Sequence, residues 1–89
     1  MNTNFFTLHI VFSIEGWNQC KVLVESQDRV LLIQDGVYLA HQDLSQWHNV
    51  YARSLDTRAR NIQTHPHIEI IDDEQWLELT EHAKNIMSW

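Results

Sequence analysis

The chain has 89 residues, a formal net charge of −6 and a hydrophobic fraction of 44%. This is the composition of one small globular domain, residues 1–89, and not of a disordered segment. The acidic balance argues against a protein that grips a nucleic-acid backbone by charge, because phosphate contacts need clustered Lys and Arg. No apolar stretch approaches the roughly 20 residues of a membrane span, and the first residues lack the basic segment of a signal peptide. We therefore expect a cytoplasmic protein with no membrane contact.

Strand and helix signals alternate from the start of the chain. Residues 5–12 are rich in β-branched and aromatic side chains and predict a strand. Residues 14–25 predict a helix with one apolar face. The continuous apolar run at 30–33 is typical of a strand covered on both sides, as parallel strands are. A short helix over residues 37–47 should follow.

The second half of the chain repeats this alternation. Residues 49–52 predict a strand, 55–60 a helical turn or two, and 68–71 a further strand. Asp72 should begin the last helix, because Gln75 stands at the spacing of a capping box. The buried stripe of that helix would consist of Trp76, Leu79, Ala83 and Ile86.

Strands that alternate with helices predict βαβ units with right-handed crossovers. The expected fold class is therefore α/β, a three-layer α/β/α domain with a small, mainly parallel sheet of about four strands. Functional groups of such sheets collect beyond the carboxyl ends of the strands. Here those ends lie near Ser13, Asp35, Arg53 and Asp72.

Four segments in a fixed order carry a more specific pattern. They are Leu8-His9, the LLIQDGV run of residues 31–37, Tyr51-Ala52 with Asp56 and Ala59-Arg60, and Ile70-Ile71-Asp72 with Thr80, His82 and Met87-Ser88-Trp89. In this order and spacing the chain resembles the TusB/DsrH family over residues 8–89. Two positions depart from the family pattern. Asn61 replaces a Gly and tolerates the same left-handed backbone, and Ser26-Gln27-Asp28 replaces an EGD turn.

The resemblance implies a subunit of a sulfurtransferase (sulfur-relay) hetero-oligomer with DsrE/DsrF-like, or TusD/TusC-like, partners. Such complexes pass persulfide sulfur, in the Tus branch toward 2-thiouridine at the tRNA wobble position and in the Dsr branch during sulfur oxidation. The main persulfide cysteine lies on a partner subunit, so it stays open whether this chain is itself catalytic. No cofactor and no direct tRNA contact are expected. A stand-alone homo-oligomeric binding module is the remaining alternative.

Cys20 is the only thiol in the chain, so it cannot form an internal disulfide, and this agrees with a reducing compartment. It could carry a persulfide, with Lys21 favouring the thiolate. It could instead be a small apolar residue on the helix face that it shares with Trp17 and Val24. Because Cys20 lies beyond the first helical turn, where a helix dipole would activate it, the second interpretation is favoured.

The other candidate residues also have two interpretations. Asp35-Gly36 could form a binding turn, or Asp35 could cap the next helix while Gly36 permits the bend. Arg53, Arg58 and Arg60 could bind phosphate or an acidic partner, or form a solvated surface. The family resemblance favours Arg60.

His65 and His67 flank Pro66, but a zinc site needs three or four ligands and the sequence supplies no further motif, so we predict no metal. Trp89 should either fold back on its own core or anchor a neighbouring subunit. We expect Trp89, together with Met87, to be ordered and at least half buried, at or beside a subunit contact.

Overall fold

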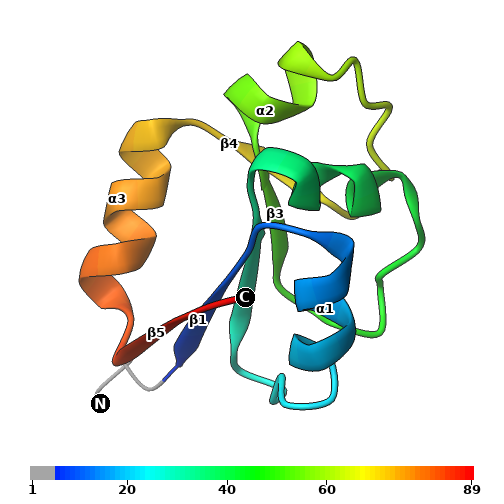
Figure 1. The fold of residues 1–89 in the computed structure, drawn as a ribbon. Helices are drawn as coiled ribbons and strands as arrows, with labels where there is room; N and C mark the ends of the chain where they lie inside the picture. Colours follow the sequence, from blue (N-terminus) through cyan, green and yellow to red (C-terminus); the bar gives the residue numbers. More distant parts are fainter. Residues whose placement is uncertain (1–5) are drawn as a thin grey trace.

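A single parallel sheet forms the centre of the molecule (Figure 1). The computed structural model describes residues 6–89, so Phe5, the predicted start of the first strand, lies outside the described residues. In this described part of the chain, five strands pair in the order β4-β3-β2-β1-β5, and all four ladders are parallel. The strands are β1 Thr7–Val11, β2 Arg29–Leu32, β3 Val50–Arg53, β4 Glu69–Ile71 and β5 Asn85–Ser88. The predicted α/β class with a mainly parallel sheet is confirmed.

Helices cover both faces of this sheet. They are α1 Ile14–Cys20, the 3-10 helix η1 Gln34–His41, α2 Ser54–Ala59 and α3 Asp73–His82. Figure 1 shows α3 on one side of the sheet and α1 and η1 on the other. Side chains of β1 alternate between the two layers, with Val11 in the core beneath α1 and η1, and Leu8 and Ile10 in the core beneath α3. None of the helices within residues 6–89 has the length and apolar character to cross a membrane.

The last helix begins where the sequence places it. Asp72 accepts a hydrogen bond from the Gln75 amide at 2.9 Å, and the Gln75 side chain accepts one from the Asp72 amide at 3.0 Å. This reciprocal pair is the predicted capping box. Leu79 is buried, and Trp76 and Ala83 pack against the same core. Three of the four predicted stripe residues therefore face the sheet.

The predicted extension of this helix through Ile86 is wrong, because α3 ends at His82 and the chain becomes strand β5. Ala83 is already extended, with φ −77° and ψ 139°. The following residues pair with β1 in register, Ile86 opposite Leu8 and Met87 opposite His9. Without β5, the backbone of β1 would be an unpaired sheet edge. A helical spacing of apolar residues carries no information about that distant edge.

The first two helical segments also differ from prediction. α1 ends at Cys20 and not at Glu25, because the chain must turn back toward β2. The Asp28 carboxylate fixes that turn by accepting a hydrogen bond from the Glu25 amide at 3.1 Å. η1 occupies residues 34–41, three residues earlier than the predicted start at Val37, and is a 3-10 helix.

Candidate functional site

The carboxyl ends of the strands lie along one edge of the sheet, which we call the carboxyl edge. The four residues predicted there are in place. Ser13 follows β1, Asp35 follows β2, Arg53 ends β3 and Asp72 follows β4. Ser13 caps α1 by accepting a hydrogen bond from the Gly16 amide at 3.0 Å. Short loops thus deliver polar side chains from successive strands to one side of the molecule.

Five charged side chains form a continuous network at this edge. Arg60 donates to Asp35 Oδ1 through Nε at 3.1 Å and Nη2 at 3.0 Å. It also lies 3.5 Å from Asp56 Oδ1. Arg53 contacts the other Asp56 oxygen at 3.3 Å and grips Asp73 through two hydrogen bonds of 2.8 and 2.9 Å. We call these residues, Asp35, Arg60, Asp56, Arg53 and Asp73, the ion network.

Asp56 lies at the centre of the ion network. It is only 7% exposed, between the two arginines, and its Oδ2 also accepts the Gln34 amide at 2.8 Å. Gln34 has a positive φ of 49°, an unfavourable backbone for a residue with a side chain. The hydrogen bond that the Gln34 amide donates to Asp56 holds that turn. The buried carboxylate therefore couples the end of β2 to α2.

Of the two interpretations of Asp35, the capping role is wrong. The N-cap of η1 is Ile33, which has no side-chain cap, and Asp35 is bound to Arg60. Gly36 does not supply a positive φ either. Its role is close approach, because a Cβ at this position would collide with the carbonyl oxygen of Val11. The turn after β2 can therefore pack directly against the end of β1.

Electrostatics and exposure divide the ion network into an inner and an outer part. The two hydrogen bonds to Asp73 raise the pKa of Arg53, and the same bonds hold the pKa of Asp73 below its usual value. The side chains of Asp35 and Asp73 are 70% and 62% exposed, whereas those of Arg53 and Arg60 are 19% and 25% exposed. The carboxylates of Asp35 and Asp73 are therefore the solvent-exposed part of the network, and the guanidinium groups of the two arginines are largely covered.

Apolar side chains lie beside these charges. Ile14 and Leu55 are about half exposed, in the first turns of α1 and α2. Tyr38 is 44% exposed, and the Arg60 guanidinium lies 5.9 Å from its ring centroid. Tyr and Arg are enriched at interfaces between proteins. The described residues at this edge include no cysteine, so the edge presents binding groups and not a thiol nucleophile.

The only thiol lies elsewhere. Cys20 is 0% exposed in the core between α1 and the sheet, in the same cluster as Trp17. Val24, although beyond the end of α1, packs against this cluster. Burial, with a further contribution from the negative charge of Asp28, raises the pKa of Cys20 to about 12. Because the thiolate is the reactive form, this environment suppresses sulfur chemistry at Cys20.

A second buried polar group joins three distant parts of the chain. His9 Nε2 lies 3.2 Å from Asp28 Oδ2, and the Trp89 indole nitrogen donates to His9 Nδ1 at 3.1 Å. Indole is only a donor, so Nδ1 must accept and Nε2 must carry the hydrogen that Asp28 accepts. Burial alone would raise the pKa of Asp28, but hydrogen bonds from Thr7, Glu25 and His9 hold it below its usual value.

Trp89 thus folds back on its own domain. Its ring stacks on His9 with centroids 6.2 Å apart, and its backbone bonds to Ile10 and Phe12 at 2.8 and 2.9 Å. Gly16 of α1 lies so close that a Cβ there would collide with the Trp89 carbonyl. Met87, by contrast, is 44% exposed on β5.

Of the sequence-predicted candidates, the structure joins Asp35, Arg53 and Arg60, and leaves Arg58 exposed outside the network. Sequence reasoning gave no role to Asp56 beyond its place in a motif, and it missed Asp73. Each contacts partners more than 15 positions away, namely Gln34 and Arg53. A short-range signal did exist for Asp56, whose spacing to Arg60 is that of an i,i+4 ion pair on a helix.

Comparison with known proteins adds a family. The family model described as DsrH like protein matches residues 11–86 of the chain. The match spans the region from the end of β1 to the middle of β5 and includes the whole ion network. No curated protein matches the chain significantly.

Proposed function

The chain belongs to the DsrH-like family, and from this premise we propose that it is an auxiliary subunit of a cytoplasmic sulfur-relay complex. Members of the family act within DsrEFH-type complexes. The partners we propose are DsrE/DsrF-like (TusD/TusC-like) chains in a hetero-oligomer. The sulfur would be passed toward 2-thiouridine at the wobble position of tRNA.

The environment of Cys20 is the observation that carries the auxiliary role. A persulfide carrier must expose a thiolate to its donor and acceptor. Cys20 is fully buried and its pKa is raised to about 12. These properties support a division of labour in which a partner carries the sulfur and this chain positions that partner.

The carboxyl edge is the surface that we propose for partner binding. Asp35 and Arg60 present paired charges there, Gly36 keeps their turn close to the sheet, and Tyr38 and Leu55 add exposed apolar area. A partner with complementary charges would replace the water around these groups.

Strand β5 offers a second candidate contact. Among residues 6–89 it pairs only with β1, at the edge of the sheet, and Met87 is 44% exposed on it. Methionine is enriched at interfaces between proteins. Trp89 would support this contact indirectly, since it holds the end of β5 against His9 and α1.

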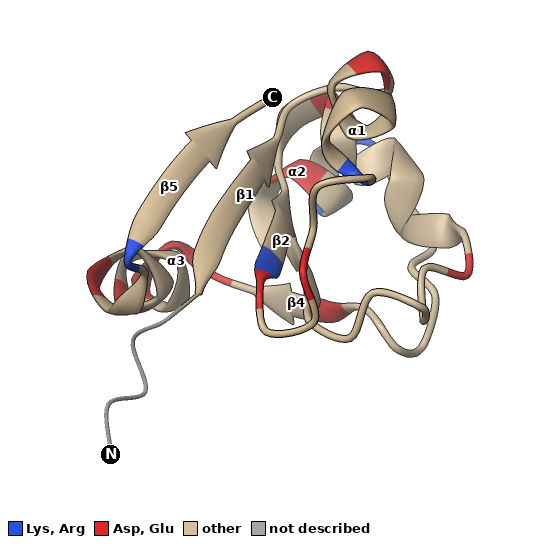
Figure 2. Ribbon diagram, turned by 90° about the horizontal axis from the view of Figure 1, so that it is seen from below, with Lys and Arg blue, Asp and Glu red and all other residues tan. Residues whose placement is uncertain are grey.

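Charge supports assigning tRNA binding to another subunit. The net charge is −6. Figure 2 shows the Lys and Arg segments as separate patches among Asp and Glu. Arg53 and Arg60 are already neutralised by the carboxylates of the ion network. We expect the isolated chain to bind tRNA only weakly in a gel-shift titration at physiological salt.

Co-purification with DsrE/DsrF-like chains, followed by light scattering, tests the proposed assembly. We expect a hetero-oligomer, which Arg60→Ala weakens about tenfold, or about 1.4 kcal/mol. Arg58→Ala is the matched control, because Arg58 lies in the last turn of α2, two residues before the C-cap Arg60, and outside the ion network. A homo-oligomer that does not bind these chains would instead support a stand-alone binding module.

Mass spectrometry after incubation of the complex with a persulfide donor tests the division of labour. We expect added sulfur on a partner cysteine and none on Cys20. Sulfur on Cys20 would overturn the auxiliary role. Deletion of the gene separates the two branches. Loss of 2-thiouridine from tRNA would support the tRNA branch, and unchanged 2-thiouridine would support a role of the same complex in sulfur oxidation.

A further inference from the structure

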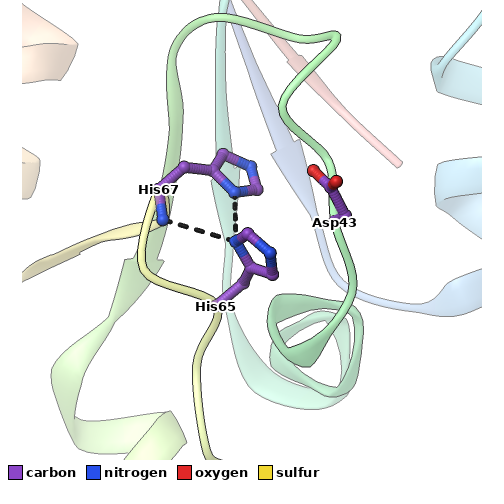
Figure 3. A group of neighbouring side chains, drawn as sticks. All are labelled: Asp43, His65 and His67. Atoms are coloured by element: carbon purple, nitrogen blue, oxygen red, sulfur yellow. Dashed lines mark hydrogen bonds between the residues drawn. The ribbon is translucent and has the colours of Figure 1, made fainter.

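Two histidines and a carboxylate from separate loops lie together outside the ion network. His65 and His67 flank Pro66 in the loop that leads into β4, and Asp43 lies in the loop after η1. One side-chain atom of each can serve as a metal ligand, and the three atoms all lie within 4.8 Å of one another. Figure 3 shows the Asp43 carboxylate beside the two imidazole rings. The histidine pair alone was too few ligands for a site, but the fold supplies a third.

The two imidazoles are already almost at the spacing of shared ligands. Their Nδ1 atoms lie 2.7 Å apart and share a hydrogen bond, which a bound ion would replace; the ring centroids are 4.7 Å apart and the ring planes meet at 67°. In a tetrahedral zinc site, two ligand atoms lie about 3.4 Å apart. The nitrogens of His65 and His67 would therefore have to separate by roughly 0.7 Å. Small side-chain rotations achieve a movement of this size.

The backbone holds the histidine loop in place. The His65 amide donates to the Ala40 carbonyl at 2.7 Å, which ties the loop to the end of η1. The His65 carbonyl accepts from the Ile68 amide at 3.0 Å, and the Ile68 side chain is buried in the core. Pro66 restricts the backbone between these two anchors. The ligand-bearing loop is thus preorganised, and little ordering remains for an ion to impose.

Charge and hydrogen bonding at the cluster favour a cation. Asp43 contributes a carboxylate, and its Oδ1 accepts a hydrogen bond from the Ser45 amide at 3.0 Å. His67 Nε2 is buried and has no hydrogen-bond partner within residues 6–89. A buried polar atom without a partner is uncommon in native proteins. It is not the ligand atom in this arrangement, in which the Nδ1 atoms of both histidines face the ion.

We propose that Asp43, His65 and His67 bind a divalent transition-metal ion, for which Zn²⁺ is the representative. Two imidazoles and one carboxylate are a donor set that zinc and its neighbours accept. Rotation of the exposed Asp43 side chain brings its oxygen onto the ion. Three protein ligands leave a fourth position open to water or to a donor atom of another molecule. The site is independent of the sulfur-relay role, because none of the three residues belongs to the ion network.

The test is a titration of the isolated, metal-free chain with Zn²⁺ against a chromophoric chelator. We expect one tightly bound ion per chain. His65→Gln, His67→Gln and Asp43→Asn should each weaken binding about tenfold or more. His82→Gln is the matched control and should bind as the wild type does, because His82 lies on α3 at the opposite face of the sheet.

A second readout uses Co²⁺, whose visible absorption reports the geometry of its ligands. We expect a strong tetrahedral spectrum in the wild type that is lost in Asp43→Asn. This variant changes an exposed side chain, so it should keep the fold even if a histidine variant does not. Equal affinity in the wild type and Asp43→Asn, or an equal loss in His82→Gln, would overturn the proposal.

Discussion

Replacing Trp89 separates two contributions that its indole makes to the domain. Trp89→Phe keeps an aromatic ring against His9 but removes the indole N–H. Trp89→Ala removes the ring as well. If Trp89 stabilises its own domain, both changes must lower the stability of the isolated chain, and the second must lower it more.

The structure sets the size of each effect. His9 is 2% exposed, so Trp89→Phe leaves its Nδ1 buried without a donor, a loss of about 1–3 kcal/mol. Trp89→Ala adds the loss of packing, and truncation of a large aromatic costs about 3–5 kcal/mol. A domain of 89 residues is stable by only about 4–13 kcal/mol. Trp89→Ala therefore removes a large share of the total.

Thermal and urea unfolding of the isolated chain, followed by circular dichroism, measures both effects. A loss of about 2 kcal/mol lowers the Tm of a domain of this size by about 8–16 °C. Trp76→Phe is the control, because within residues 6–89 the Trp76 indole nitrogen makes no hydrogen bond. If Trp89→Phe unfolds like the control, and Trp89→Ala weakens only the binding of partners, then Trp89 is an interface anchor and the reasoning fails.

Three further outcomes follow from the buried groups. Cys20→Ser should leave assembly and sulfur transfer intact and cost about 1–3 kcal/mol in stability; loss of transfer in an assembled complex would contradict this. The pKa of Asp28 is lower in the folded state than its ordinary value of 3.8. Ionised Asp28 therefore stabilises the fold fully above pH 3.8, and this contribution is lost as the pH falls through the folded-state pKa. Acid titrations should therefore show a shallower loss of stability in Asp28→Asn than in the wild type, and equal slopes would refute this. Gly36→Ala should cost about 1–3 kcal/mol, because its Cβ would press on the Val11 carbonyl, and an unchanged melting curve would show that the turn yields freely.

Sequence reasoning succeeded where neighbouring residues decide the structure. The capping box of Asp72 and Gln75 needs only a spacing of three, and it forms as predicted. Asn61 adopts the left-handed conformation, with φ 52°, that was expected of the residue after the helix. The prediction from sequence failed at Ile86. Its spacing to Ala83 fits a helix, but Ile86 pairs with β1 at the edge of the sheet.

The fold class, the positions of β1 to β4 along the chain, the edge at which charged residues collect and the family resemblance could all be predicted from the sequence alone. These depend on periodicity, composition and short motifs, which are local properties. Three contacts became visible in the folded chain alone: Asp56 joins Arg53 to Arg60, Trp89 binds His9, and Asp43 lies beside two histidines. Each of these contacts depends on how the sheet brings together segments that are far apart in the chain. Such distances are set by strand order and packing, and no local pattern encodes them.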